Sequence, residues 1–224
     1  MQVLSINEEN YLNVDTTTQA GLNHAKSLNF MNSPLSPSII YSPLIHEVGS
    51  IFTPSKRGRM FTLFRHPIER AVGMYFYLQT AKWDPLYNPE LSKMSIEEYA
   101  MSASMENNWM TRFLVNKKGG KLTIEDLNVA KEIIKRKCVV GLFEKMEESL
   151  IRFEIYFGWR AEMSSKQKKC EKKLLENGDE RHDHPIVEKG TKGWKALMQQ
   201  NRFDMELYQY AVKLFDEQGK IKKL

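Results

Sequence analysis

The part of this chain that most constrains its fold is a basic turn between an apolar run and a helix-like run. The apolar run is Met60 to Phe64, the turn is Arg65 to Arg70, and the helix-like run is Ala71 to Thr80. Pro67 suits the first turn of a helix, where no backbone N–H is needed. Unpaired N–H groups at a helix N-terminus attract anions, and a guanidinium just before them can bind phosphate through two nitrogens. The pattern predicts a strand, a phosphate-binding turn and a helix.

The same residues have a simpler interpretation at an ordinary strand-to-helix junction. Arg65 and Arg70 can be solvated there, or they can pair with the neighbouring carboxylate of Glu69. The spacing Arg-x-Pro-x-x-Arg alone does not separate the two interpretations. The strand before the turn and the helix after it favour the phosphate site.

Alternating strand and helix signals elsewhere predict an α/β fold with a mostly parallel sheet flanked by helices. Capping residues mark several helix starts, including Ser95 with Glu98 and Thr123 with Asp126. The expected elements are a helix capped near Asp15 and Thr16 that ends about Leu28, a strand at 39–41, a helix from Pro43 toward Phe52, a helix from Thr123 through Lys137, a strand at Cys138–Leu142 and a helix at Met146–Phe157.

The length of 224 residues and a hydrophobic content of 42% support one substantial domain with a real core. We expect a charged loop or excursion at about 163–192, where lysine and glutamate dominate. Helices within 193–218 are expected to dock on the core, because Leu207, Ala211 and Leu214 share one helix face. The net charge of +5 suits anionic ligands such as nucleotides or acidic glycans.

The residues Arg65, Pro67, Arg70, Gly73 and Tyr75 resemble the 3′-phosphate-binding motif of sulfotransferases that use 3′-phosphoadenosine 5′-phosphosulfate (PAPS). Two later segments are similar to the Golgi-type carbohydrate sulfotransferases, namely Val140 to Leu150 and Asn201 to Ala211. The resemblance implies a P-loop-kinase-like three-layer sandwich. It also implies that Arg65 and the residue at position 73 hold the donor's 3′-phosphate. Gly73 stands where that family has a serine.

A second resemblance concerns the loop from Lys189 to Lys195. It is similar to the lid of cytosolic sulfotransferases, whose basic glycine turn also meets the 3′-phosphate. Lys189 and Gly190 are therefore candidate cofactor-binding residues. The alternative is a plain basic loop, since glycine and lysine are common in surface loops.

The family's other cofactor element, a loop of the type Pro-Lys-x-Gly-[Thr/Ser]-Thr that embraces the 5′-phosphosulfate, does not occur before Arg65. Asp15 to Thr18 supplies hydroxyls without the glycine turn or the lysine, as a helix cap does. We expect either an N-terminally incomplete sequence or a family member that has lost catalysis. The resemblance implies the Golgi lumen as compartment if an N-terminal membrane anchor is missing.

A sulfotransferase needs a general base for the attacking hydroxyl, and His46 is the candidate, with Glu47 as the fallback. His46 can equally be a histidine on a helix surface. Cys138 and Cys170 cannot form a tetrahedral metal site by themselves, so no metal is expected. Neither a nucleic-acid signature nor an apolar stretch long enough to span a membrane is found in the sequence.

The expected function is transfer of a sulfuryl group from PAPS to a hydroxyl of a carbohydrate or related acceptor. The first alternative is an inactive sulfotransferase relic that acts as a nucleotide-binding or protein-interaction domain. A basic helical interaction domain, in which the phosphate-like turn is a coincidence, is the second alternative.

Overall fold

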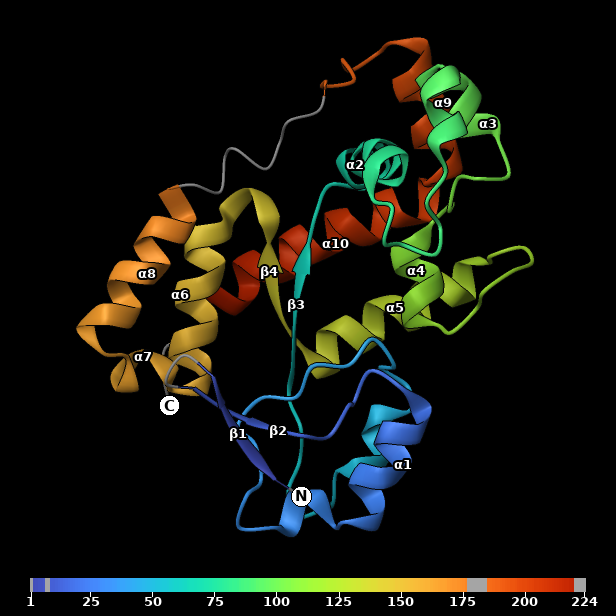
Figure 1. Ribbon diagram of the computed structural model, residues 1–224. Helices are drawn as coiled ribbons and strands as arrows, with labels where there is room; N and C mark the ends of the chain where they lie inside the picture. Colours follow the sequence, from blue (N-terminus) through green and yellow to red (C-terminus); the bar gives the residue numbers. More distant parts are fainter. Residues whose placement is uncertain (1, 7–8, 177–184, 220–224) are drawn as a thin grey trace. The chain divides into compact units, whose positions relative to one another are not determined.

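The computed structural model describes residues 2–6, 9–176 and 185–219 of the chain (Figure 1). It divides into two compact units, residues 1–59 and residues 60–224, where the sequence predicted one domain.

The first unit contains a small antiparallel hairpin and one α-helix. Strand β1 (Val3–Ile6) pairs with β2 (Glu9–Leu12). Helix α1 (Gln19–Ser27) ends near the predicted residue, but its N-cap is Thr18, whose hydroxyl accepts the N–H of Gly21. A local core surrounds the helix and consists of Leu22, Ala25, Phe30, Met31 and Ile51.

Two predicted elements of this unit are wrong. Residues 39–41 form no strand, and the helix predicted from Pro43 is reduced to a 3₁₀ turn at Val48–Ile51. Side chains of residues 39 and 41 are exposed, at 54% and 76%. An isolated apolar tripeptide gains no strand pairing or burial there, which explains why it stays irregular.

The second unit is organised by two parallel strands, β3 (Met60–Phe64) and β4 (Cys138–Leu142). Their register runs from Met60 beside Cys138 to Phe64 beside Leu142, so both strands end at the same edge. Every residue of β4 is buried, as expected for a strand in a parallel sheet. Both strand predictions are confirmed.

Helices surround the strand pair and make up most of the second unit (Figure 1). The predicted capping boxes form at Ser95 with Glu98 and at Thr123 with Asp126. The helices are α2 (Pro67–Thr80), α3 (Ile96–Met101), α4 (Trp109–Leu114), α5 (Ile124–Lys137), α6 (Met146–Phe157), α7 (Trp159–Glu162), α8 (Ser165–Glu176), α9 (Lys192–Gln200) and α10 (Arg202–Gly219), with 3₁₀ turns at Pro89–Lys93 and Phe143–Lys145.

The long helix α10 ties the second unit together. It buries Phe203, Leu207, Ala211, Leu214 and Phe215 on one side. Near its end, the Gln218 side chain accepts the N–H of Val140 at 2.9 Å and donates to the Cys138 carbonyl at 3.0 Å. The Gln218 side chain thus bonds to an N–H and a carbonyl of β4 that a further strand would otherwise pair with. In this way the end of α10 covers one edge of the sheet.

The fold is α/β, which confirms the coarse prediction, but the described residues contain one parallel pair and one antiparallel pair of strands. The region predicted as a charged loop at 163–192 contains helix α8 and the start of α9, while residues 177–184 lie outside the described part. In the described residues, no helix combines the length and the apolar character that a membrane span requires.

Candidate functional site

The predicted phosphate turn lies at the carboxyl end of the parallel strand pair. Because Phe64 pairs with Leu142, Arg65 and Phe143 leave the sheet at the same edge. Ligands of α/β proteins bind outside this edge, where strands give way to helices. Helix α2 begins there with Pro67 in its first turn, and the side chain of its N-cap residue, His66, makes no hydrogen bond to the first turn. Its first backbone N–H groups therefore point toward the edge as potential anion donors.

The Arg65 side chain is directed toward the neighbouring strand end. Its guanidinium carbon lies 5.1 Å from the centre of the Phe143 ring, within the range of a cation–π contact. Arg65 is half-buried. The contact with the aromatic ring restricts the positions that the guanidinium can adopt at this edge.

Glu144, Tyr208 and His66 form a polar cluster beside this turn. Glu144 Oε1 accepts the backbone N–H of His66 at 2.8 Å, and the Tyr208 side chain hydrogen-bonds to the same carboxylate. The His66 and Tyr208 rings meet edge to face, with centres 5.3 Å apart. These contacts join the turn to the residues after β4 and to α10.

The cluster changes the ionisation of its members. Burial lowers the pKa of His66, against the opposing effects of Glu144 and Glu69, so the imidazole is held in its neutral form near pH 7. Burial and the Glu144 carboxylate raise the pKa of Tyr208, which keeps the phenol protonated. A neutral imidazole next to a cationic turn can accept a proton, a property shared by general bases.

Lys189 belongs to the same neighbourhood. Its positive charge also lowers the pKa of His66, which places the ammonium group within electrostatic range of the turn. Gly190 follows in a left-handed conformation with φ of 92°, and Thr191 caps α9 by accepting the N–H of Trp194. Lys189 and Gly190 are exposed. The structure thus brings the second predicted basic segment toward the first.

Gly73 lies about two turns into α2 and is half-buried. It follows Arg65 on the same strand-turn-helix unit, as the motif requires. Because glycine supplies no hydroxyl, an anion at this place would depend on the other groups of the turn.

Arg70 is directed away from Arg65, toward α4. Its guanidinium stacks 4.7 Å from the Trp109 ring, which itself stacks on Phe113 at 4.9 Å. Its buried Nε has no hydrogen-bond partner in the described part of the chain. Burial lowers the pKa of Arg70, and the buried carboxylate of Asp204 opposes this effect. Arg70 is therefore half-buried against Trp109 rather than fully solvated.

His46, the predicted base, belongs to the first unit, where it lies in an exposed turn before Val48–Ile51. Its role as a base stays a prediction. Glu144 and Tyr208, by contrast, were not predicted as site residues. The sequence signal for Glu144 was its position two residues after a buried parallel strand, at the edge where ligands bind.

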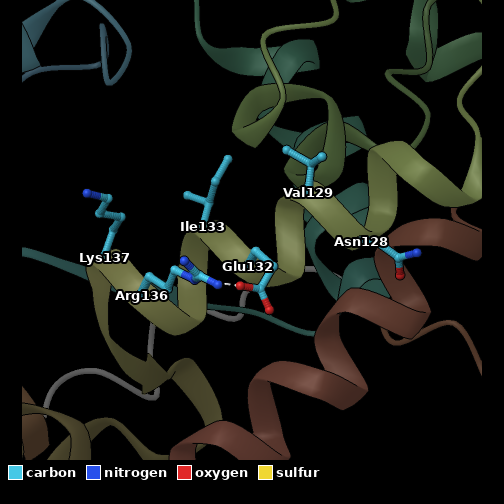
Figure 2. A pocket seen from close by; sticks show the side chains of 6 residues that line it. All are labelled: Asn128, Val129, Glu132, Ile133, Arg136 and Lys137. Atoms are coloured by element: carbon cyan, nitrogen blue, oxygen red, sulfur yellow. Dashed lines mark hydrogen bonds and ion pairs between the residues drawn. The ribbon is translucent and has the colours of Figure 1, made fainter.

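A separate hollow of about 430 Å³ runs along the outer side of α5 (Figure 2). It is lined by Asn128, Val129, Glu132, Ile133, Arg136 and Lys137. The Val129 and Ile133 side chains extend from successive turns, and Arg136 pairs with Glu132 at 2.6 Å. None of the predicted site residues lines it. The described residues contain no group of three histidine, cysteine, aspartate or glutamate side chains arranged to hold a metal.

No family model, curated protein or solved structure matches this chain.

Proposed function

We propose that the second unit binds the 3′-phosphate of PAPS and belongs to a sulfotransferase that acts on a hydroxyl of a carbohydrate or related acceptor. The observation that carries the proposal is the position of Arg65, between the end of a parallel strand and the N-terminus of α2. This geometry is the one that the motif requires. A P-loop-kinase-like three-layer sandwich is part of the proposal, with β3 and β4 as its parallel strands.

Each group of the turn has a definite task in this proposal. Arg65 donates two N–H groups to the 3′-phosphate, and the first N–H groups of α2 add further hydrogen bonds. Lys189 and Gly190 approach from the loop before α9 and contribute charge and backbone donors. Gly73 supplies no side-chain donor, so the other groups of the turn must hold the phosphate.

The chemistry of sulfuryl transfer sets two further demands. The attacking hydroxyl must lose a proton, and the bridging oxygen of the donor must be stabilised as it gains negative charge. His46 remains the proposed base, from its place in the sequence upstream of the phosphate turn. His66 is an additional candidate, because it combines a lowered pKa with a position next to Arg65.

A second candidate function is nucleotide or anion binding without transfer. The Glu144 carboxylate favours such a relic over a complete donor site, since it already accepts the N–H of His66 at 2.8 Å and adds a negative charge beside the turn. That N–H is therefore not available to a phosphate in this conformation. A relic domain that keeps the basic turn but performs no chemistry accounts for this contact.

The test is calorimetric titration of the 224-residue chain with adenosine 3′,5′-bisphosphate, the desulfated product of the donor. Arg65→Ala removes hydrogen bonds to a charged phosphate, each about 1.5–3 kcal/mol, so we expect binding to weaken by about tenfold to a hundredfold or more. Gly73→Ser should strengthen binding where the helix accepts the hydroxyl. Arg136→Ala is the matched control, because its side chain is exposed on α5.

Unchanged affinity in the Arg65 variant would show that the turn is not the nucleotide site. Where the nucleotide binds through Arg65, incubation with radiolabelled PAPS and a panel of glycans separates the two candidate functions. Transfer of label to an acceptor supports the enzyme, and binding without transfer supports the relic.

A further inference from the structure

The loop that follows α2 presents one aromatic and one aliphatic side chain to solvent. This Trp83 loop comprises residues 81–88 and joins α2 to the 3₁₀ turn at Pro89–Lys93. Trp83 is 80% exposed, more than any other large apolar side chain in the described part of the chain, and Leu86 is 59% exposed. A single apolar side chain on a surface needs no explanation, but two on one short loop indicate a contact surface.

Backbone hydrogen bonds fold the Trp83 loop back on the end of α2. The N–H of Tyr87 donates to the Asp84 carbonyl at 2.9 Å, and the N–H of Asn88 donates to the Leu78 carbonyl at 2.8 Å. The second of these bonds connects the end of the loop to the last turn of the helix. A loop that already holds its conformation loses less entropy on binding than a disordered one does.

The Asp84 side chain supports the same conformation. Its Oδ1 accepts the N–H of Leu86 at 2.7 Å, and its Oδ2 accepts the Tyr77 hydroxyl at 3.1 Å. The Tyr77 ring meets the Trp83 ring edge to face, with centres 6.4 Å apart. Both exposed side chains are therefore supported from inside the loop, Leu86 through its backbone and Trp83 through Tyr77.

The charges around the two apolar side chains leave a cation facing outward. Asp84 is half-buried and directs both oxygens to donors within the loop and α2. Glu90, in the following 3₁₀ turn, pairs with Lys93 at 2.6 Å. Lys82, next to Trp83, is exposed and makes no ion pair within the residues that the structure describes. The loop thus combines an apolar tip with one positive charge beside it.

We propose that the Trp83 loop inserts into the interfacial layer of a membrane that contains anionic lipids. Tryptophan joins an apolar ring to an N–H donor, and it is enriched where the acyl chains of a bilayer meet the headgroups. Leu86 adds an aliphatic side chain at the same depth, and the ammonium group of Lys82 reaches the lipid phosphates. Apolar burial and attraction to anionic lipids act together in this kind of binding.

Two other partners fit the Trp83 loop less well. A sugar ring stacked on Trp83 needs polar groups beside it, and the oxygens of Asp84 already have partners within the protein. A protein partner must supply a pocket of matching shape for each anchor and a rim around it. A membrane accepts a side chain as exposed as Trp83 without a matching pocket.

The Trp83 loop is separate from the phosphate turn. The two lie at opposite ends of α2, which has 14 residues and is about 21 Å long at a rise of 1.5 Å per residue. The membrane proposal therefore does not depend on the proposed function.

The test is sedimentation of the full chain with lipid vesicles at several lipid concentrations. One set of vesicles contains phosphatidylcholine alone, and the other contains phosphatidylcholine and phosphatidylserine. The loop variant combines Trp83→Ala with Leu86→Ala. The matched control combines Ile39→Ala with Tyr41→Ala, which also removes one aliphatic and one aromatic side chain of similar exposure.

We expect the loop variant to bind the mixed vesicles about tenfold or more weakly than the unaltered chain, while the control binds as the unaltered chain does. Lys82→Glu should weaken binding to the mixed vesicles more than to phosphatidylcholine alone, because it reverses the charge that meets the anionic lipid. Failure of the unaltered chain to bind either set of vesicles, or equal losses in the two double variants, would overturn the proposal.

Quenching of tryptophan fluorescence by brominated lipids identifies the side chain that enters the membrane. Trp83→Phe keeps a large apolar ring, so this variant should still bind the mixed vesicles but lose most of the quenching. Quenching that persists in Trp83→Phe would assign the insertion to one of the other three tryptophans and overturn the proposal. Association of the chain without lipid that disappears in the loop variant would overturn it in favour of a contact between copies.

Titration of the loop variant with adenosine 3′,5′-bisphosphate keeps the two proposals distinguishable. We expect nucleotide binding to be the same in the loop variant and the unaltered chain, because the phosphate turn lies at the other end of α2. Binding to vesicles through Trp83 without any nucleotide binding refutes the donor assignment and leaves the membrane proposal standing.

Discussion

Replacing Asp204 by alanine tests the contact that holds α10 against α4. Asp204 is fully buried, with 0% of its surface exposed. Its carboxylate accepts the backbone N–H of Met110 at 2.9 Å, and the N–H and hydroxyl of Thr111 at 2.8 and 2.7 Å. Burial raises the pKa of Asp204, and these donors together with Arg70 oppose the shift. The carboxylate is therefore stable inside the protein only because it is so fully bonded.

The loss expected from Asp204→Ala follows from these bonds. The substitution leaves two backbone N–H groups and one hydroxyl buried without partners, at about 1–3 kcal/mol for each group before relaxation. Because neighbouring losses are not additive, we expect a decrease of about 3–5 kcal/mol in the free energy of unfolding. Such a decrease is a large part of the roughly 5–15 kcal/mol that stabilises a typical domain.

The assay is urea unfolding at pH 7 followed by tryptophan fluorescence. All four tryptophans, at positions 83, 109, 159 and 194, belong to the second unit, so the signal reports on that unit alone. Asp216→Ala is the control, because this carboxylate is mostly exposed and lies 3.8 Å from Lys145. We expect the control to lose less than about 1 kcal/mol.

A double-mutant cycle with Thr111→Val isolates one of the three bonds. The hydroxyl of Thr111 should couple to the Asp204 carboxylate by about 1.5–3 kcal/mol, as hydrogen bonds to charged groups do. A coupling energy near zero, or a loss below about 1 kcal/mol for Asp204→Ala, would refute the structural role given to this carboxylate.

Two further predictions concern β4. Gly141→Ala should lower the free energy of unfolding by about 1–3 kcal/mol, because the new Cβ would lie 2.6 Å from the Phe153 ring and 2.9 Å from Ser149. Gly119→Ala is the control in the same urea titration, because a Cβ at that position meets open space. Burial raises the pKa of the Cys138 thiol to about 12 from 9.0, so stability present below pH 9 is lost as the pH rises toward 12. We expect the free energy of unfolding to fall between pH 7.5 and pH 10.5 by about 2 kcal/mol more in the unaltered chain than in Cys138→Ala. Equal decreases in the two proteins would contradict this prediction.

The sequence predicted the elements whose signals are local. Strands β3 and β4 were found at their observed bounds, and Pro67 marked the start of α2. Capping boxes at Ser95 and Thr123 are patterns of four residues, which need no knowledge of the tertiary fold. The order of strands and helices predicted a mostly parallel sheet, but it did not predict that β3 pairs with β4.

Other elements were missed for identifiable reasons. The hairpin of β1 and β2 exposes most of its side chains, so it has no strong alternation of apolar and polar residues to reveal it. Helix α8 buries nothing and therefore lacks an apolar period. Lysine, glutamate and leucine are good helix formers, and this propensity was the available signal for α8.

The candidate site was predictable only in part. Arg65 and Gly73 lie on one strand-turn-helix unit, which the local pattern already predicted, while their role in binding a phosphate stays a prediction. Glu144 and Tyr208 reach the turn from 78 and 142 residues further along the chain, and their contacts with His66 depend on the docking of α10. No local pattern carries that information.

Helix α10 gives the site a physical dependence on the stability of the second unit. Along this one helix, Asp204 holds α4, Tyr208 bonds to Glu144 beside the phosphate turn, and Gln218 closes the edge of β4. If the proposed function is right, a substitution that loosens α10 weakens nucleotide binding and unfolding stability together. Arg65→Ala removes a ligand without touching α10, so it should weaken binding while the urea midpoint stays near that of the unaltered chain. The combination of titration and tryptophan unfolding thus separates residues that bind the anion from residues that build its site.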